Sequence, residues 1–221
     1  MRKIFISISS VIVLGASLAA GQSFINLDFE GAADLPPYSG LGATTNLLPG
    51  WSAFVGAMPA SNVLYNAFNA SPAVELLGSN ALVPDGNFCV SLAGGGSVSQ
   101  TGTIPTDAES LLFDALPNNS SQPFFVSLDG QDLSYFALSN SISSYGHAYT
   151  IYGANISAFA GDEETLAFSV HIGGGSLDDI QFSTMIVPEP PAISLILLSS
   201  GILIYARYRF QKKPYSRSGS G

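Results

Sequence analysis

The sixteen carboxylates are the most abundant titratable side chains of this chain, and they lack matching cations. All of them lie between Asp28 and Glu189, whereas residues 4–206 contain no Lys or Arg. Clustered carboxylates repel one another unless a cation neutralises them, and Ca²⁺ takes about six to eight oxygen ligands. Two interpretations stay open, a weak calcium site or solvated surface charges. No Asp-x-Asp-x-Asp-Gly loop occurs, so an EF-hand is excluded.

Groups for catalysis are scarce. The imidazoles are His147 and His171, and the Gly-x-Ser-x-Gly turn of many serine hydrolases is absent. A catalytic serine set stays open because serine is abundant, but structural or exposed histidines are the simpler interpretation. One cysteine and two histidines do not supply a usual zinc site. We expect no enzymatic activity and no required cofactor, with a secreted hydrolase as the lesser alternative.

Two ligand classes are disfavoured by composition. The glycine runs 94–96 and 173–175 lack the following helix and lysine of a phosphate-binding loop. The acidic body has no basic patch, which argues against nucleic acid.

Aromatic side chains could supply a platform for sugars, because ligand sites combine aromatic walls with a few polar groups. Trp51 follows Pro49-Gly50, and we expect it to fill the core. Tyr145, His147 and Tyr149 alternate, so an extended segment would place them on one face, as a platform or as packing. The ligand-binding residues stay unknown; other available aromatics are Tyr65, Phe68, Tyr135 and Tyr152.

The elements that must position these residues are β-strands. Short runs of branched and aromatic residues alternate with Gly, Asn, Ser and Pro turns, and only 154–161 could carry a turn of helix. This pattern predicts one all-β domain over 22–187, an antiparallel jelly-roll sandwich. Cys89 cannot form an internal disulfide and lies in an apolar alternation, so we expect it to be buried. The predicted strands are 24–29, 51–55, 74–77, 88–92, 97–101, 110–116, 124–128, 131–133, 148–151, 165–170 and 176–182.

The N-terminus is typical of a secretory signal over residues 1–21. Arg2-Lys3 precedes the apolar run 4–18, and residues 16–21 offer small side chains for cleavage. An uncleaved anchor helix or a first core strand is the alternative.

The C-terminus is typical of a membrane anchor. Ala192–Ala206 carries no charge and is followed by a basic cluster; as a helix it would span about 22 Å against about 30 Å of hydrocarbon. The preceding prolines mark its start. Basic residues at both ends favour retention of the ends in the cytoplasm and export of the acidic body. The alternative is a buried last element of the domain. The basic cluster is Arg207, Arg209, Lys212 and Lys213.

This C-terminal arrangement resembles the PEP-CTERM sorting signal of exported bacterial proteins. The matching residues are Val187, Pro188, Glu189 and Pro190, then the apolar run and the basic cluster, within a signal over 188–213. The resemblance implies cleavage by an exosortase near this motif, in a Gram-negative host that makes exopolysaccharide. Residues 214–221 form a tail richer in Ser and Gly than most such tails, which we expect to be disordered.

The body resembles galactose-binding-like and carbohydrate-binding jelly rolls. The pieces are Asn26 to Gly31, Leu48 to Trp51, Pro84 to Asn87, Val98 to Thr101, Leu112 to Asp114, and the run Leu177-Asp178-Asp179-Ile180. In those proteins the first and last strands are neighbours and can share one Ca²⁺. The resemblance implies a structural calcium held by Glu30 with Asp178 or Asp179, and by Asp28 as a further ligand.

The expected function is therefore that of a non-enzymatic protein exported through the inner membrane. The C-terminal helix would anchor the precursor until exosortase releases it to the cell surface or the biofilm matrix. The main alternative is a carbohydrate-binding module with a defined glycan ligand. Expected partners are exosortase, the inner membrane, and exopolysaccharide or a neutral glycan.

Overall fold

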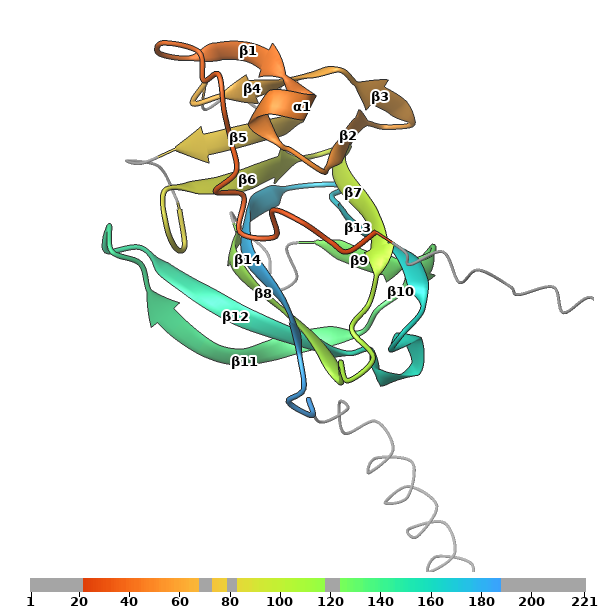
Figure 1. Cartoon of the computed structure of the whole chain (residues 1–221). Helices are drawn as coiled ribbons and strands as arrows, with labels where there is room; N and C mark the ends of the chain where they lie inside the picture. Colours follow the sequence, from red (N-terminus) through yellow and green to blue (C-terminus); the bar gives the residue numbers. More distant parts are fainter. Residues whose placement is uncertain (1–21, 68–72, 79–82, 118–123, 188–221) are drawn as a thin grey trace, which may run out of the picture.

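The computed structural model describes residues 22–67, 73–78, 83–117 and 124–187. These residues form two β-sheets, antiparallel except where β4 pairs with β5 in parallel, and a short helix lies beside β1 (Figure 1). The expectation of an all-β fold with two sheets is confirmed. The predicted signal segment, the helix over 192–206 and the tail over 214–221 lie outside the described residues.

The larger sheet has eight strands among the described residues. Their order is β1 (Gly40–Ala43), β4 (Asn62–Tyr65), β5 (Val74–Gly78), β6 (Phe88–Ala93), β14 (Gly174–Ser183), β8 (Ser110–Pro117), β12 (Ala148–Asn155) and β11 (Tyr135–Ile142). The last strand of the body, β14, therefore lies inside this sheet, between β6 and β8. It pairs Ser176 with Ser91 on one side and Asp178 with Asp114 on the other.

The smaller sheet has six described strands and packs against the first. Their order is β10 (Gln131–Asp132), β9 (Phe125–Leu128), β13 (Glu163–Ser169), β7 (Gly96–Thr103), β2 (Ser52–Val55) and β3 (Met58–Ala60). The helical elements are α1 (Thr44–Leu47) and the 3₁₀ turn η1 (Ser157–Phe159), the latter within the segment 154–161 where a helical turn was expected.

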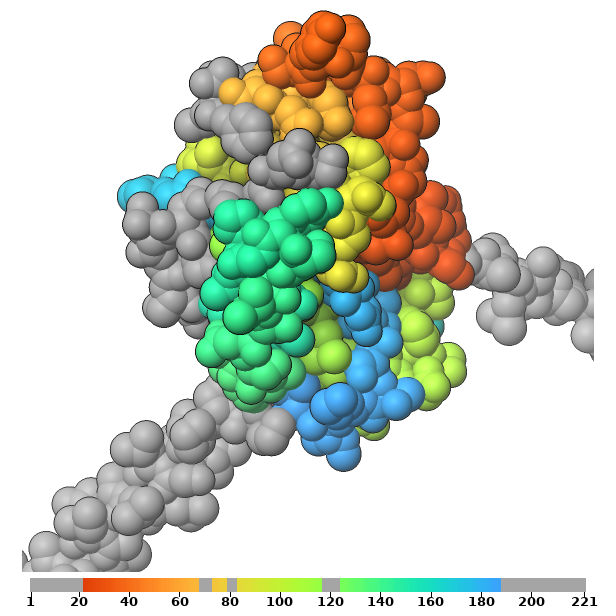
Figure 2. All heavy atoms as spheres, turned by 90° about the vertical axis from the view of Figure 1, so that its left-hand side faces the viewer, coloured from red at the N-terminus to blue at the C-terminus, as the bar shows by residue number. Residues whose placement is uncertain are grey.

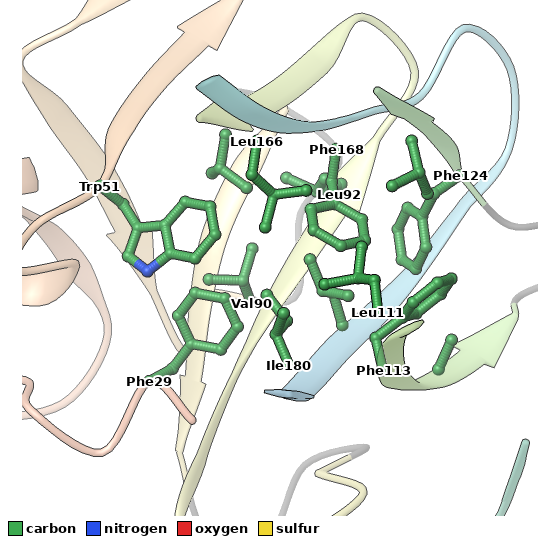
Figure 3. Close-up of a cluster of buried hydrophobic side chains, with 14 of the residues drawn as sticks. Phe29, Trp51, Val90, Leu92, Leu111, Phe113, Phe124, Leu166, Phe168 and Ile180 are labelled. Carbon is green, nitrogen blue, oxygen red and sulfur yellow. The ribbon is translucent and has the colours of Figure 1, made fainter. Parts of the chain in front are cut away.

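The core lies between the sheets and is rich in aromatic rings (Figure 3). Phe113 is fully buried and packs edge-on against Phe168, with ring centroids 5.2 Å apart. It also stacks on Tyr152 at 5.5 Å. At the other end of the core Trp51 lies 5.4 Å from Phe29. The alternation of the strands thus places one side of each sheet in a dry interior, without any disulfide among the described residues.

One predicted strand is wrong. Residues 24–29 form an irregular segment with a turn at 27–28 instead of a strand, and an isolated bridge joins Ser23 to Thr103. Asn26 and Phe29 have positive φ values of 50° and 56°, which lie outside the extended region of a regular strand. The Asn26 side chain stabilises this shape, because its Oδ1 accepts the Gly31 N–H at 2.7 Å. The local hydrogen bonds of this asparagine outweigh the strand preference of its apolar neighbours.

Candidate functional site

Glu30 caps the turn that precedes β6. Its Oε1 accepts the backbone N–H groups of Asn87 at 2.5 Å and Phe88 at 2.9 Å, and its Oε2 accepts the Asn87 side-chain amide at 3.0 Å. Gly86 adopts a φ of +61° beside this carboxylate, and an added Cβ would collide with Oε1. Ionised acceptors make strong hydrogen bonds, so Glu30 fixes the 84–87 turn.

Asp178 is the most buried carboxylate of the predicted set, with 1% of its surface exposed. Its Oδ2 accepts the Asp85 N–H at 3.1 Å, and its Oδ1 accepts the Asp179 N–H at 2.8 Å. Asp179 has a φ of +41° and accepts a bond from the Gln181 amide at 2.6 Å. The register of β14 with β8 shifts between Asp178 and Gln181, so this pair marks a bulge.

The structure brings the first and last parts of the body together, as expected. The Ile180 N–H donates to the Leu27 carbonyl at 3.0 Å, which joins the N-terminal segment to β14. The 84–87 turn connects the two carboxylates, because Asp85 binds Asp178 while Asn87 binds Glu30. Asp28 is exposed and makes a local contact, in which its Oδ1 accepts the Glu30 N–H at 3.3 Å.

Asp114 is a member of this acidic group that the sequence reasoning missed. It is 4% exposed and lies directly opposite Asp178 on the neighbouring strand. Burial raises the pKa of Asp114 to about 7, with Asp179 and Asp85 adding repulsion. Burial also raises the pKa of Asp178 to about 8. The hydrogen bonds from the Asp85 and Asp179 backbone N–H groups oppose this rise in the pKa, whereas repulsion by Asp114 and Asp179 adds to it. The two facing carboxyls therefore favour a protonated form near neutral pH.

The residues predicted to hold calcium are thus close in the fold but already bonded to backbone groups. Within the described ranges, no three or more His, Cys, Asp or Glu side chains are grouped so that they could hold a metal ion. Each carboxylate oxygen has further lone pairs, so calcium binding stays a prediction that needs a rearranged ligand set.

The aromatic candidates divide into core and surface residues. Trp51 is 4% exposed, and its indole N–H donates to the Asn26 carbonyl at 2.9 Å, which confirms the expected core position. Tyr135 and Tyr152 are also buried. Tyr145 lies in the turn before β12 and Tyr149 within that strand, so they do not form one strand face. Phe68 lies outside the described residues.

An aromatic-lined cleft of about 480 Å³ lies where β9, β10 and the start of β11 meet. Phe125 is 52% exposed, and its ring lies 4.4 Å from the His171 ring. Asp132 and Ser134 supply polar groups on the exposed side of this cleft. Aromatic walls with a few polar groups are the ordinary composition of a small-ligand site.

Cys89 is buried in a small cluster with Leu77 and Val83, as expected. Burial raises the pKa of its thiol far above the usual range, and nearby Asp178 adds to this effect. A thiol that stays protonated is a poor nucleophile, so packing is its role.

Val187 is the last described residue, and it belongs to the folded body. It is 2% exposed, and its side chain lies over Gly153, beside Leu112 and Leu138. The rest of the predicted sorting motif, Pro188 to Pro190, and the basic cluster lie outside the described residues. In the part of the chain that the structure describes, no helix is both long and apolar enough to cross a membrane.

Comparison of the chain with known proteins does not assign it to a family. No protein-family model matches the chain, and no curated protein matches its sequence.

Proposed function

We propose that this chain is a non-enzymatic protein exported through the inner membrane, anchored by residues 192–206, and released to the cell surface or matrix by an exosortase. The observation that carries the proposal is the segregation of charge. All seven Lys and Arg residues lie in the two termini, beside the apolar runs, and all sixteen carboxylates lie between those ends. This distribution is what the positive-inside rule gives for an exported body.

The finer fold assignment is part of the same proposal. The two sheets and the contact between residues 27 and 180 support a jelly roll of the galactose-binding-like kind. The buried Val187 supports the division of the chain, because the body extends at least to this residue, which directly precedes the Pro-Glu-Pro motif.

The test is processing in a host that has an exosortase. A tagged chain should become shorter and leave the membrane, and both changes should be lost in an exosortase deletion. Replacement of Pro188, Glu189 and Pro190 by alanine should give the same loss, whereas Ser218→Ala in the tail should be processed normally. Identical size and location with and without the exosortase would contradict the proposal.

The second candidate function is binding of a neutral glycan, favoured by the cleft around Phe125. A glycan array with residues 22–187 is the direct test, and the acidic body favours neutral over anionic sugars. Asp132→Asn should weaken any ligand found there, whereas Asp107→Asn, outside the cleft, should not. Equal glycan binding by the two variants would show that this cleft is not the binding site.

A further inference from the structure

The last described segment of the body, residues 185–187, holds two apolar side chains in solvent. Met185 is 60% exposed and Ile186 is 72% exposed, whereas the adjacent Val187 is buried. The backbone here is fixed, because the Ser110 hydroxyl donates to the Met185 carbonyl at 2.7 Å and the Met185 N–H donates to the Ser183 hydroxyl at 3.0 Å. These side chains are therefore presented by the fold itself.

The distance from this segment to the proposed membrane anchor is short. Four residues, 188–191, separate Val187 from the uncharged run that begins at Ala192. The five Cα–Cα steps from Val187 to Ala192 reach at most about 18 Å when the chain is extended. The headgroup layer on each side of a bilayer is about 5–7 Å thick. An anchor helix shorter than the hydrocarbon core also draws its flanking residues toward the bilayer. The body cannot stand far from the lipid surface.

Other apolar groups lie at the same end of the sandwich. The Glu109 N–H donates to the Ser183 carbonyl at 2.8 Å, which places the β7–β8 loop beside the end of β14. An apolar cleft of about 570 Å³ lies next to it, where Phe24 and Phe182 contact each other with ring centroids 4.9 Å apart. The end of β14 and residues 184–187, drawn in blue, form the lower tip of the described body in both orthogonal views (Figures 1 and 2).

We propose that Met185, Ile186 and the cleft beside Phe182 form a membrane-contact surface, which rests on the headgroup layer while the chain is anchored. This inference rests on the anchor of the proposed function. The partner is a neutral lipid surface, because Asp107 and Glu109 at this end repel anionic lipids. Apolar side chains in the interface gain free energy from burial, and the tether keeps them there.

The test compares two ends of one strand. Ile172 precedes β14 and is 92% exposed, so it matches Ile186 in type but lies at the opposite end of the ten-residue strand, about 30 Å away. The full chain carries Cys89→Ala and either Ile186→Cys or Ile172→Cys, labelled with an environment-sensitive fluorophore. It is reconstituted in phosphatidylcholine vesicles that contain a headgroup-labelled quenching lipid.

We expect quenching at position 186 to exceed that at position 172 by at least about twofold, because interfacial side chains enter the headgroup boundary. A flexible linker of about twenty residues after Val187, with a reach near 25 Å, should reduce the difference. Anionic vesicles at low salt should reduce it as well. Equal quenching at the two positions, or no effect of the linker, would overturn the inference. Flotation of the vesicles checks the anchor separately: a chain that does not float refutes the membrane attachment itself.

Discussion

Asp114 and Asp178 face each other across β8 and β14, both almost fully buried and with no Lys or Arg anywhere in the body. Two buried carboxyl groups in this position cannot both ionise without a cost in free energy, so folding favours their protonated forms.

This pair predicts that the domain loses stability as the pH rises. The folded-state pKa values of about 7 and about 8 exceed the ordinary aspartate value of 3.8, so the folded domain holds more protons than the unfolded chain between about pH 4 and 8. Each extra proton lowers the free energy of unfolding by about 1.4 kcal/mol per pH unit in this window. Urea unfolding of residues 22–187 from pH 5 to pH 9 measures the slope.

Asp114→Asn should flatten this slope, since the amide keeps the shape but never ionises. Its stability relative to the original domain should therefore increase from pH 5 to pH 9. Asp107→Asn, at an exposed position, serves as the control. Parallel pH profiles for Asp114→Asn and the original domain would show that the pair does not set the pH response.

The hydrogen-bond cap made by Glu30 predicts that replacing this residue lowers the stability of the domain. Glu30→Gln weakens the acceptor of the Asn87 and Phe88 N–H groups, and we expect about 1–2 kcal/mol of destabilisation. Asp28→Asn should change stability by less than about 0.5 kcal/mol, because Asp28 is exposed. Thermal unfolding compares them, and an equal effect of the two variants would mean that the cap contributes nothing specific.

Calcium is expected to raise the melting temperature if the acidic group binds it. A ligand that binds only the folded domain adds about 2.7 kcal/mol at a hundred times its dissociation constant. Magnesium at equal ionic strength should do less, because it needs a stricter octahedral geometry. Glu30→Gln should remove the difference between the ions. An equal shift of the melting temperature with both ions would show that these carboxylates do not form a specific calcium site.

Val187 is predicted to stabilise the body although it is the first residue of the sorting motif. Val187→Ala removes two methyl groups packed beside Leu112 and Leu138, which should cost about 1–2 kcal/mol. Ile186→Ala, at an exposed position, should stay within about 0.5 kcal/mol in the soluble domain. Denaturant unfolding of residues 22–187 measures both, and two equal values would place Val187 outside the fold.

The strands that could be predicted from the sequence are those with one dry face. Residues 110–116 and 176–182 are short runs rich in apolar residues, and they lie within β8 and β14. Four strands were not predicted, namely β1, β3, β4 and β11. In β11, residues 137–140 are all exposed, so no apolar face marks the strand. An edge strand of this kind forms because it pairs with a neighbouring strand, and the local sequence pattern carries no information about that pairing.

The acidic group could be predicted only in part. Glu30 and Asp178 were found through the order of short motifs, and the fold connects them through the 84–87 turn. Asp114 escaped because alternation with Leu111 and Phe113 places it on the outer face of β8, where exposure is the normal outcome. Its burial depends on segments distant in sequence, so no local signal reveals it.

The central position of β14 has a consequence for the order of folding. This strand is the last of the body, yet it joins β6 to β8, so the larger sheet stays split until residue 183 is available. Closure of such long loops comes late and makes the final step slow and cooperative. Whether the chain emerges from a ribosome or from a membrane channel, its N-terminal part cannot lock into a finished domain ahead of its C-terminal part. The body stays incompletely folded until β14 is available to complete the larger sheet.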